Sequence, residues 1–198
     1  YGPSGSMLAW SAGRRATQRA APPLPTDVVV VAAPEFASAP VADRNGAAAA
    51  LELAADYAEV AALDPLPGAA REAGAIERVF VDRGSCAVRL GPQATEAALF
   101  ELAATARILH IATHQIPAAG TAWSAGRIVL TPPSTPGPVD DGFLEVYDLL
   151  TGWHERLRGC ELVVLSSCRS QGGALSEDEG VFGFPWGFQY AGCPCVQA

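Results

Sequence analysis

Leu162-Val163-Val164-Leu165-Ser166-Ser167-Cys168 is the stretch that decides the fold class of this chain. Its branched apolar residues predict a strand that is buried on both faces and ends in two serines and a cysteine. Upstream, Ile108-Leu109-His110-Ile111-Ala112-Thr113-His114 repeats the pattern and ends in a histidine. Open α/β sheets place their reactive groups at the carboxyl ends of the strands. The two stretches therefore predict that one His and one Cys meet at the same sheet edge.

Strands and helices alternate along most of the chain. Further strands are predicted at 28–31, 78–81, 128–130 and 195–196, helices at 47–63, 69–77, 96–106 and 181–190, and a short helix or strand at 143–150. Thr95 is the expected N-cap of the helix that begins at Glu96. Regular alternation is the signature of a parallel sheet with helices on both faces, so the predicted fold class is α/β.

Composition limits the possible functions. The chain has 198 residues, of which 49% are hydrophobic, and this is enough for one domain with a real core. Its 13 basic and 21 acidic residues give a net charge of −8, which argues against a nucleic-acid or anionic-membrane partner. Five cysteines without regular spacing argue against a disulfide framework and favour a reducing cytosol.

Seven motifs occur in an order that is similar to one known family. They are Tyr1-Gly2-Pro3-Ser4-Gly5-Ser6, Leu66-Pro67-Gly68-Ala69-Ala70-Arg71-Glu72-Ala73, Gly91-Pro92-Gln93-Ala94-Thr95, Leu109 to His114, Val163 to Cys168, Glu179-Gly180-Val181 and Tyr190-Ala191-Gly192-Cys193-Pro194. Together they resemble the CHAT domain, a bacterial branch of the caspase-like cysteine peptidases that is related to separase and often fused to tetratricopeptide repeats. The resemblance implies a caspase-like three-layer sandwich with a mostly parallel central sheet.

The resemblance also implies a domain organisation. Residues 1–198 correspond to a partial CHAT peptidase domain, truncated at both ends relative to the family pattern. Residues 26–115 lead to the His motif, 116–160 form a hairpin or insert, and 161–198 hold the Cys motif, a helix and the start of a truncated strand. We expect the family's next strand to be missing, which would leave the strand before Cys168 at or near an exposed edge of the sheet.

Cys168 and His114 are the candidate catalytic residues. A thiol attacks a carbonyl as thiolate, and its ordinary pKa near ~8.5 leaves little of that form at neutral pH. A neighbouring imidazole accepts the thiol proton and later protonates the leaving amine. We therefore expect Cys168 to be the nucleophile and His114 the base and acid. The sequence indicates no third member of the group.

Further site residues come from the resemblance. It implies that the backbone N–H groups of Gln115 and Cys168 form the oxyanion hole, although relatives have Gly at the position of Gln115 and so retain freedom for positive φ. Ser166, Arg169 and Asp178 are candidates for the substrate cleft. Arg169 stands where many relatives have Glu.

Other readings of the polar residues are simpler. His110 shares a strand face with His114 but lies about 13 Å from it, so we expect a hydrogen-bonded core histidine rather than a second ligand of a metal. Cys193 and Cys195 lack the second pair that a zinc site needs. No metal and no cofactor is expected.

The leading functional hypothesis is a cysteine endopeptidase that cleaves a protein or peptide substrate in the bacterial cytoplasm, regulated by a tetratricopeptide or other module outside this chain. A catalytically impaired scaffold that binds partners is the alternative, favoured by Gln115. A nucleotide- or phosphate-binding α/β domain is a third possibility, but the required glycine loop is absent.

Overall fold

A five-stranded sheet lies at the centre of the molecule. The computed structural model describes residues 13, 24–36, 48–116, 126–137, 140–167 and 183–198, with the side chains of 48–52 and 54 left out. The strands of the central sheet are β1 (Thr26–Pro34), β2 (Cys86–Gly91), β3 (Ala106–Ala112), β7 (Leu162–Leu165) and β8 (Val196–Gln197). Their order is β2-β1-β3-β7-β8, and every neighbouring pair is parallel.

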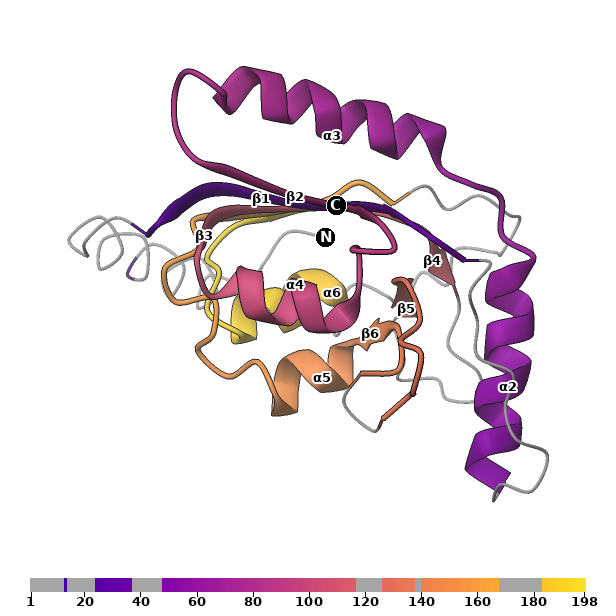
Figure 1. The fold of residues 1–198 in the computed structure, drawn as a ribbon. Coiled ribbons are helices and arrows are strands. Elements are labelled where there is room, and N and C mark those ends of the chain that lie inside the picture. Colours follow the sequence, from indigo (N-terminus) through magenta and orange to yellow (C-terminus); the bar gives the residue numbers. More distant parts are fainter. Residues whose placement is uncertain (1–12, 14–23, 37–47, 117–125, 138–139, 168–182) are drawn as a thin grey trace.

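Helices cover both faces of this sheet (Figure 1). One face is covered by α3 (Pro67–Phe80), and the other by α4 (Glu96–Ala103), α5 (Val146–Thr151) and α6 (Phe184–Tyr190). A further helix, α2 (Ala48–Ala61), stands beside the end of the sheet. The arrangement is a mixed α/β sandwich of three layers, which confirms the predicted fold class.

Burial on both faces explains the run of valines in β1. Val29 and Val31 belong to the apolar core on the side of α4 and α6, whereas Val28 and Val30 pack with Ala73 of α3. Side chains alternate between the two faces of a strand, and here both faces are covered by helices. A continuous apolar run is therefore the stable sequence for this strand.

A small antiparallel sheet adjoins the carboxyl end of β3. It consists of β4 (Gln115–Ile116), β5 (Arg127–Val129) and β6 (Phe143–Glu145), in that order. Its apolar side chains form a second core with α2 and the residues that follow β1: Phe36, Tyr57, Val60, Ile116, Val129 and Phe143. The predicted element at 143–150 begins as β6 and continues as α5.

The strand predicted at 78–81 is wrong. Helix α3 continues through these residues to Phe80, and Val79 and Val81 are 52% and 70% exposed. Three apolar residues in a row, Val79 to Val81, cannot be assigned to strand or helix by period alone, and here the helix that begins at Pro67 extends into them. The strand that pairs with β1 on the side away from β3 is β2, which begins five residues after Val81, at Cys86. Similarly, the helix predicted at 96–106 ends at Ala103, because β3 begins at Ala106.

The strand before Cys168 lies next to the edge of the sheet rather than at it, which fits the expectation of a position at or near an edge. β7 lies between β3 and β8, with Val163 paired to Val196 and Val164 paired to Gln197. The side of β7 that faces away from β3 is thus paired over two residues with β8, which corresponds to the strand predicted at 195–196.

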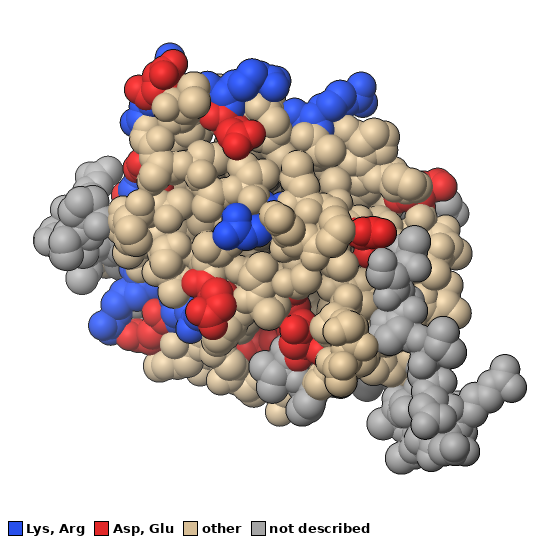
Figure 2. Space-filling view, in the orientation of Figure 1, with Lys and Arg blue, Asp and Glu red and all other residues tan. Residues whose placement is uncertain are grey.

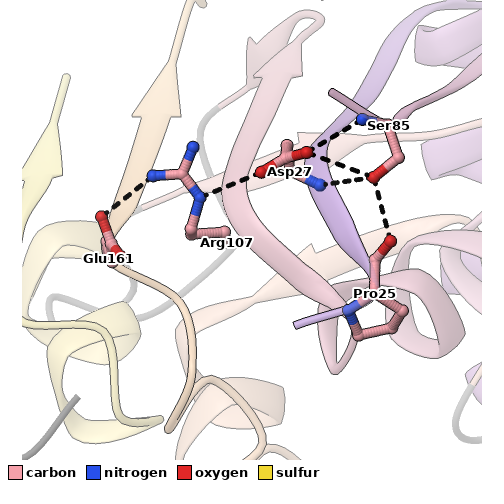
Figure 3. A network of polar contacts seen from close by, with 5 residues as sticks. All are labelled: Pro25, Asp27, Ser85, Arg107 and Glu161. Atoms are coloured by element: carbon pink, nitrogen blue, oxygen red, sulfur yellow. Dashed lines mark hydrogen bonds and ion pairs between the residues drawn. The ribbon is translucent and has the colours of Figure 1, made fainter. Parts of the chain in front are cut away.

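A polar network joins the amino-terminal ends of the strands (Figure 3). The Arg107 guanidinium lies 3.3 Å from Asp27 Oδ1 and 3.3 Å from Glu161 Oε2, and the backbone N–H of Ser85 donates to Asp27 at 2.9 Å. The Ser85 N–H, followed by the Arg107 guanidinium, lowers the pKa of Asp27 against the opposing effect of desolvation. The starts of β1, β2, β3 and β7 are thereby connected at the edge opposite the candidate site.

Candidate active site

Strands β1, β3 and β7 end at one edge of the sheet. Ala32 is paired with Ala112, and Ile111 with Leu165, so the residues that follow these strands leave the sheet side by side. The N–H of Ser166 still donates to the carbonyl of Ile111 at 2.8 Å. The segment that leads into Cys168 therefore leaves the sheet next to the end of β3. His114 follows the last residue of β3 by two positions. Cys168, Arg169 and Asp178 lie outside the described residues.

The imidazole of His114 is buried and held in a defined orientation. His114 is only 6% exposed, and its Nε2 lies 2.8 Å from the backbone carbonyl oxygen of Asp64. A carbonyl only accepts, so Nε2 carries the hydrogen of this bond. In the neutral ring, Nδ1 is then the nitrogen with the free electron pair. The ring of Phe36 lies 5.3 Å from the imidazole and limits its rotation.

The Asp64 carbonyl depends on the packing of α2. The Tyr57 hydroxyl donates to the carbonyl of Asp141 at 2.7 Å, and the Tyr57 ring stacks on Phe143 at 5.8 Å. A bidentate ion pair joins Arg127 of β5 to Asp56 of α2, with N–O distances of 2.5 and 2.8 Å. These contacts fix α2 on the small antiparallel sheet, and the chain continues from α2 directly to Asp64.

An unusual backbone conformation brings Phe36 to the histidine. Ala33 has a φ of 45°, and the register of β1 with β2 shifts between Ala32 and Pro34. A residue with a side chain is strained in the left-handed region, and such strain is concentrated at functional sites. Beyond this bend, the N–H of Glu35 donates to Thr131 Oγ1 at 2.9 Å. The chain is thus turned across the edge of the sheet, toward His114.

Gln115 connects the ends of β3 and β7. The carbonyl of His114 accepts from the N–H of Val129 at 3.0 Å, and no described peptide bond is cis. In a trans peptide, the N–H of Gln115 must point opposite to that carbonyl, which is away from β5. The Gln115 side chain accepts from the Ser167 hydroxyl at 3.4 Å. The residue immediately before Cys168 is therefore in contact with the residue immediately after His114.

A second polar group lies under α3, on the face of the sheet that carries His110. His110 is buried, as predicted, but the predicted hydrogen bond is not found at Nε2, which lies 3.3 Å from Glu72 Oε1 without making a hydrogen bond within the described residues. The Ser166 hydroxyl donates to the other carboxylate oxygen of Glu72 at 3.0 Å. Burial lowers the pKa of His110, and the Glu72 carboxylate opposes this shift. Ser166 was predicted as a cleft residue, and this role stays a prediction because the contact that the structure describes is to Glu72.

Asp64 and Glu72 contribute to this site, but neither could be recognised from the sequence. Asp64 acts through its main-chain carbonyl, which every residue has. Glu72 lies within a motif of the family resemblance, but nothing in its spacing distinguishes it from Glu77 on the same helix. Within the described ranges, no three His, Cys, Asp or Glu side chains are grouped so that they could hold a metal ion, and no helix is long and apolar enough to cross a membrane.

Comparison with known proteins gives one match. The family model of the CHAT domain matches residues 1–198, which is the whole chain. No curated protein and no solved structure matches it.

Proposed function

Because the chain belongs to the CHAT domain family, a group of caspase-like, peptidase-related domains, we propose that it is a cysteine endopeptidase with Cys168 as nucleophile and His114 as base. The orientation of His114 is the observation that carries this proposal. Its Nε2 hydrogen is taken by the Asp64 carbonyl, which leaves Nδ1 as the proton acceptor in the neutral ring. The parallel pairing of β3 and β7 directs the segment toward Cys168 along the same edge.

The reaction follows from these roles. His114 Nδ1 takes the proton of the Cys168 thiol, and the thiolate attacks the carbonyl carbon of the scissile peptide bond. The electron pair of the C=O bond moves to the oxygen and returns when the C–N bond breaks, while His114 protonates the departing amine. Water, deprotonated by His114, then cleaves the thioester and regenerates the Cys168 thiol. The Asp64 carbonyl stabilises the imidazolium that forms twice in this cycle.

The oxyanion hole is proposed at the backbone N–H groups of Gln115 and Cys168. Two observations support this assignment: the Gln115 N–H points away from β5, and the Gln115 side chain contacts Ser167, the residue before Cys168. Preorganised N–H donors stabilise the tetrahedral oxyanion and contribute about 3 kcal/mol each to lowering the barrier. Arg169 and Asp178 remain proposed cleft residues.

Alkylation and cleavage test the proposal together. The protein is treated with a limiting amount of iodoacetamide, and the modified cysteine is mapped by mass spectrometry; Cys168 should react fastest, since Cys160 and Cys193 are buried. A fluorogenic peptide library varied at the residue before the scissile bond should be cleaved by the protein and by its Cys195→Ala control. The Cys168→Ala variant should leave every peptide intact. Equal cleavage by the Cys168→Ala variant would sink the mechanism.

A catalytically impaired scaffold is the second candidate, favoured by the contact of the Gln115 side chain with Ser167. This contact places a side chain against Ser167, at a position where relatives of the family have glycine. If this candidate is right, Cys168 is alkylated no faster than Cys195, and the peptide library stays intact. The same two measurements therefore separate the two functions.

The partners and location are part of the proposal. We propose that the substrate is a protein or peptide, that a tetratricopeptide or other module controls the site, and that the protein acts in the bacterial cytoplasm. The charge of −8 supports a partner that is not a nucleic acid. On the face shown in Figure 2, arginine and carboxylate side chains are interspersed without a broad basic area, which supports the same proposal.

A further inference from the structure

Glu72 of α3 contacts both strands that lead to the candidate dyad. Its Oε2 accepts from the hydroxyl of Ser166, one residue beyond β7, and its Oε1 lies 3.3 Å from Nε2 of His110 in β3. The three residues come from different motifs of the sequence: the segment 66–73, the His motif and the Cys motif. The fold brings one polar residue of each motif together on the face of the sheet that α3 covers.

The Ser166 contact fixes the chain where it leaves the sheet. The backbone N–H of Ser166 donates to the Ile111 carbonyl at 2.8 Å, and its side chain donates to Glu72 at 3.0 Å. The next residue, Ser167, donates to Gln115. Two consecutive residues are thus held by β3, α3 and β4 immediately before Cys168. Among the described residues, α3 is the helix whose side chain forms a hydrogen bond with Ser166.

We propose that Glu72 is a positioning residue of the candidate active site, which sets the end of β7, and with it Cys168, relative to His114. This inference rests on the proposed function of the two residues. Glu72 does not act on the substrate; it acts through Ser166. Rates of nucleophilic attack are steeply sensitive to such positioning, since a displacement of about 1 Å can cost about a hundredfold.

A carboxylate suits this position. Ser166 presents a hydroxyl hydrogen to it, and His110 presents the edge of a ring whose Nε2 has no hydrogen-bond partner within the described residues. The contact with His110 is therefore electrostatic, whereas the contact with Ser166 is a hydrogen bond. The Glu72 side chain remains 40% exposed, so its charge stays hydrated while it reaches both strands. It can hold β7 without the desolvation cost of a fully buried ion.

The test compares Glu72→Ala with Glu77→Ala, an exposed glutamate on the same helix. The first readout is the rate of alkylation of Cys168 by iodoacetamide at fixed pH, which needs no substrate. The second is cleavage of a peptide from the library described above. For Glu72→Ala, both the alkylation rate and kcat should fall by about tenfold to a hundredfold, with KM changed less than about twofold. Glu77→Ala should match the unmodified protein in both.

Two further variants separate positioning from folding. Glu72→Gln keeps an oxygen that can accept from Ser166, so it should recover most of the activity lost in Glu72→Ala. Ser166→Ala should lose as much as Glu72→Ala, and the double variant should lose no more than either single one. A helix residue with a purely structural role would lower the melting temperature of the variant, yet leave kcat of the folded protein unchanged.

The inference and the proposed function fail differently. If no peptide is cleaved by any form of the protein, the peptidase proposal fails, and the alkylation rates still decide the role of Glu72. If Cys168 reacts equally fast in Glu72→Ala and Glu77→Ala, the positioning role is refuted, whatever the peptide assay shows. If Glu72→Ala does not fold, Ser166→Ala carries the same comparison with a smaller change.

Discussion

Replacing Arg127 by Met should destabilise the protein more than breaking any other ion pair among the described residues. The Arg127 side chain is 7% exposed and its partner Asp56 is 21% exposed, so the bidentate pair is largely removed from water. The guanidinium also lies 4.5 Å from the centre of the Phe143 ring. Met fills the apolar volume of the Arg stem, but leaves the Asp56 carboxylate without its charge partner.

The expected loss in free energy of unfolding is about 3 kcal/mol. Breaking a buried ion pair by removing one member costs about 3–5 kcal/mol, and the partial exposure of Asp56 places this case at the lower end. With a urea m-value of about 2.5 kcal/mol/M for a chain of this size, the midpoint of unfolding should fall by about 1 M. The assay is urea unfolding at pH 7 followed by circular dichroism and by tryptophan fluorescence.

A second variant identifies the cause. In the Asp56→Leu/Arg127→Met double variant both charges are gone, and stability should return to within about 1 kcal/mol of the unmodified protein. If Arg127→Met alone costs less than about 1 kcal/mol, or if the double variant loses the sum of the two single losses, the pair does not hold α2 to the small sheet. The argument for how Asp64 is placed would then be wrong.

Two other expected outcomes concern a buried carboxyl and the oxyanion hole. Burial, with a smaller contribution from Asp141, raises the pKa of Glu96 to about 9, above its ordinary unfolded value of 4.5; stability is therefore lost as the pH rises through this interval, because the unfolded chain ionises first. Glu96→Gln should be more stable than the unmodified protein by about 1 kcal/mol or more at pH 8, and the gain should vanish at pH 4 in thermal unfolding; an equal gain at both values would contradict the assignment. Gln115→Gly should maintain or raise kcat on a library peptide, since the backbone N–H is kept and φ becomes free. A large fall in kcat would show that the oxyanion hole lies elsewhere.

Sequence predicted the sheet where burial is complete on both faces. The apolar runs of β1, β3 and β7 predict buried strands, and the alternation of strands with helices predicts their parallel pairing, which the structure has. β2 was not found, because it is the last strand of the sheet on its side and every residue from Cys86 to Gly91 is only partly buried. Such a strand needs no apolar run, and the nearby apolar residues Val79 to Val81 belong to the end of helix α3 instead.

The sequence predicted the sheet edge at which the site lies, but not the orientation of its side chains. Parallel strands must bring His114 and the segment before Cys168 to one edge, and this much follows from the pattern alone. The orientation of the imidazole does not, because it is set by a main-chain carbonyl between two helices and by the ring of Phe36. Both contacts join segments that are far apart in the sequence, and the residue types at these positions do not predict the contacts.

These contacts imply that the two catalytic candidates are held by different parts of the fold. His114 is oriented through Asp64 by α2, which the Asp56–Arg127 pair and Tyr57 fix to the small antiparallel sheet. The segment before Cys168 is held by Glu72 of α3. Helices α2 and α3 are consecutive, and Asp64 lies in the short connection between them. A displacement of this connection would therefore disturb the histidine directly and the end of β7 through α3, so one movement could change both members of the dyad at once.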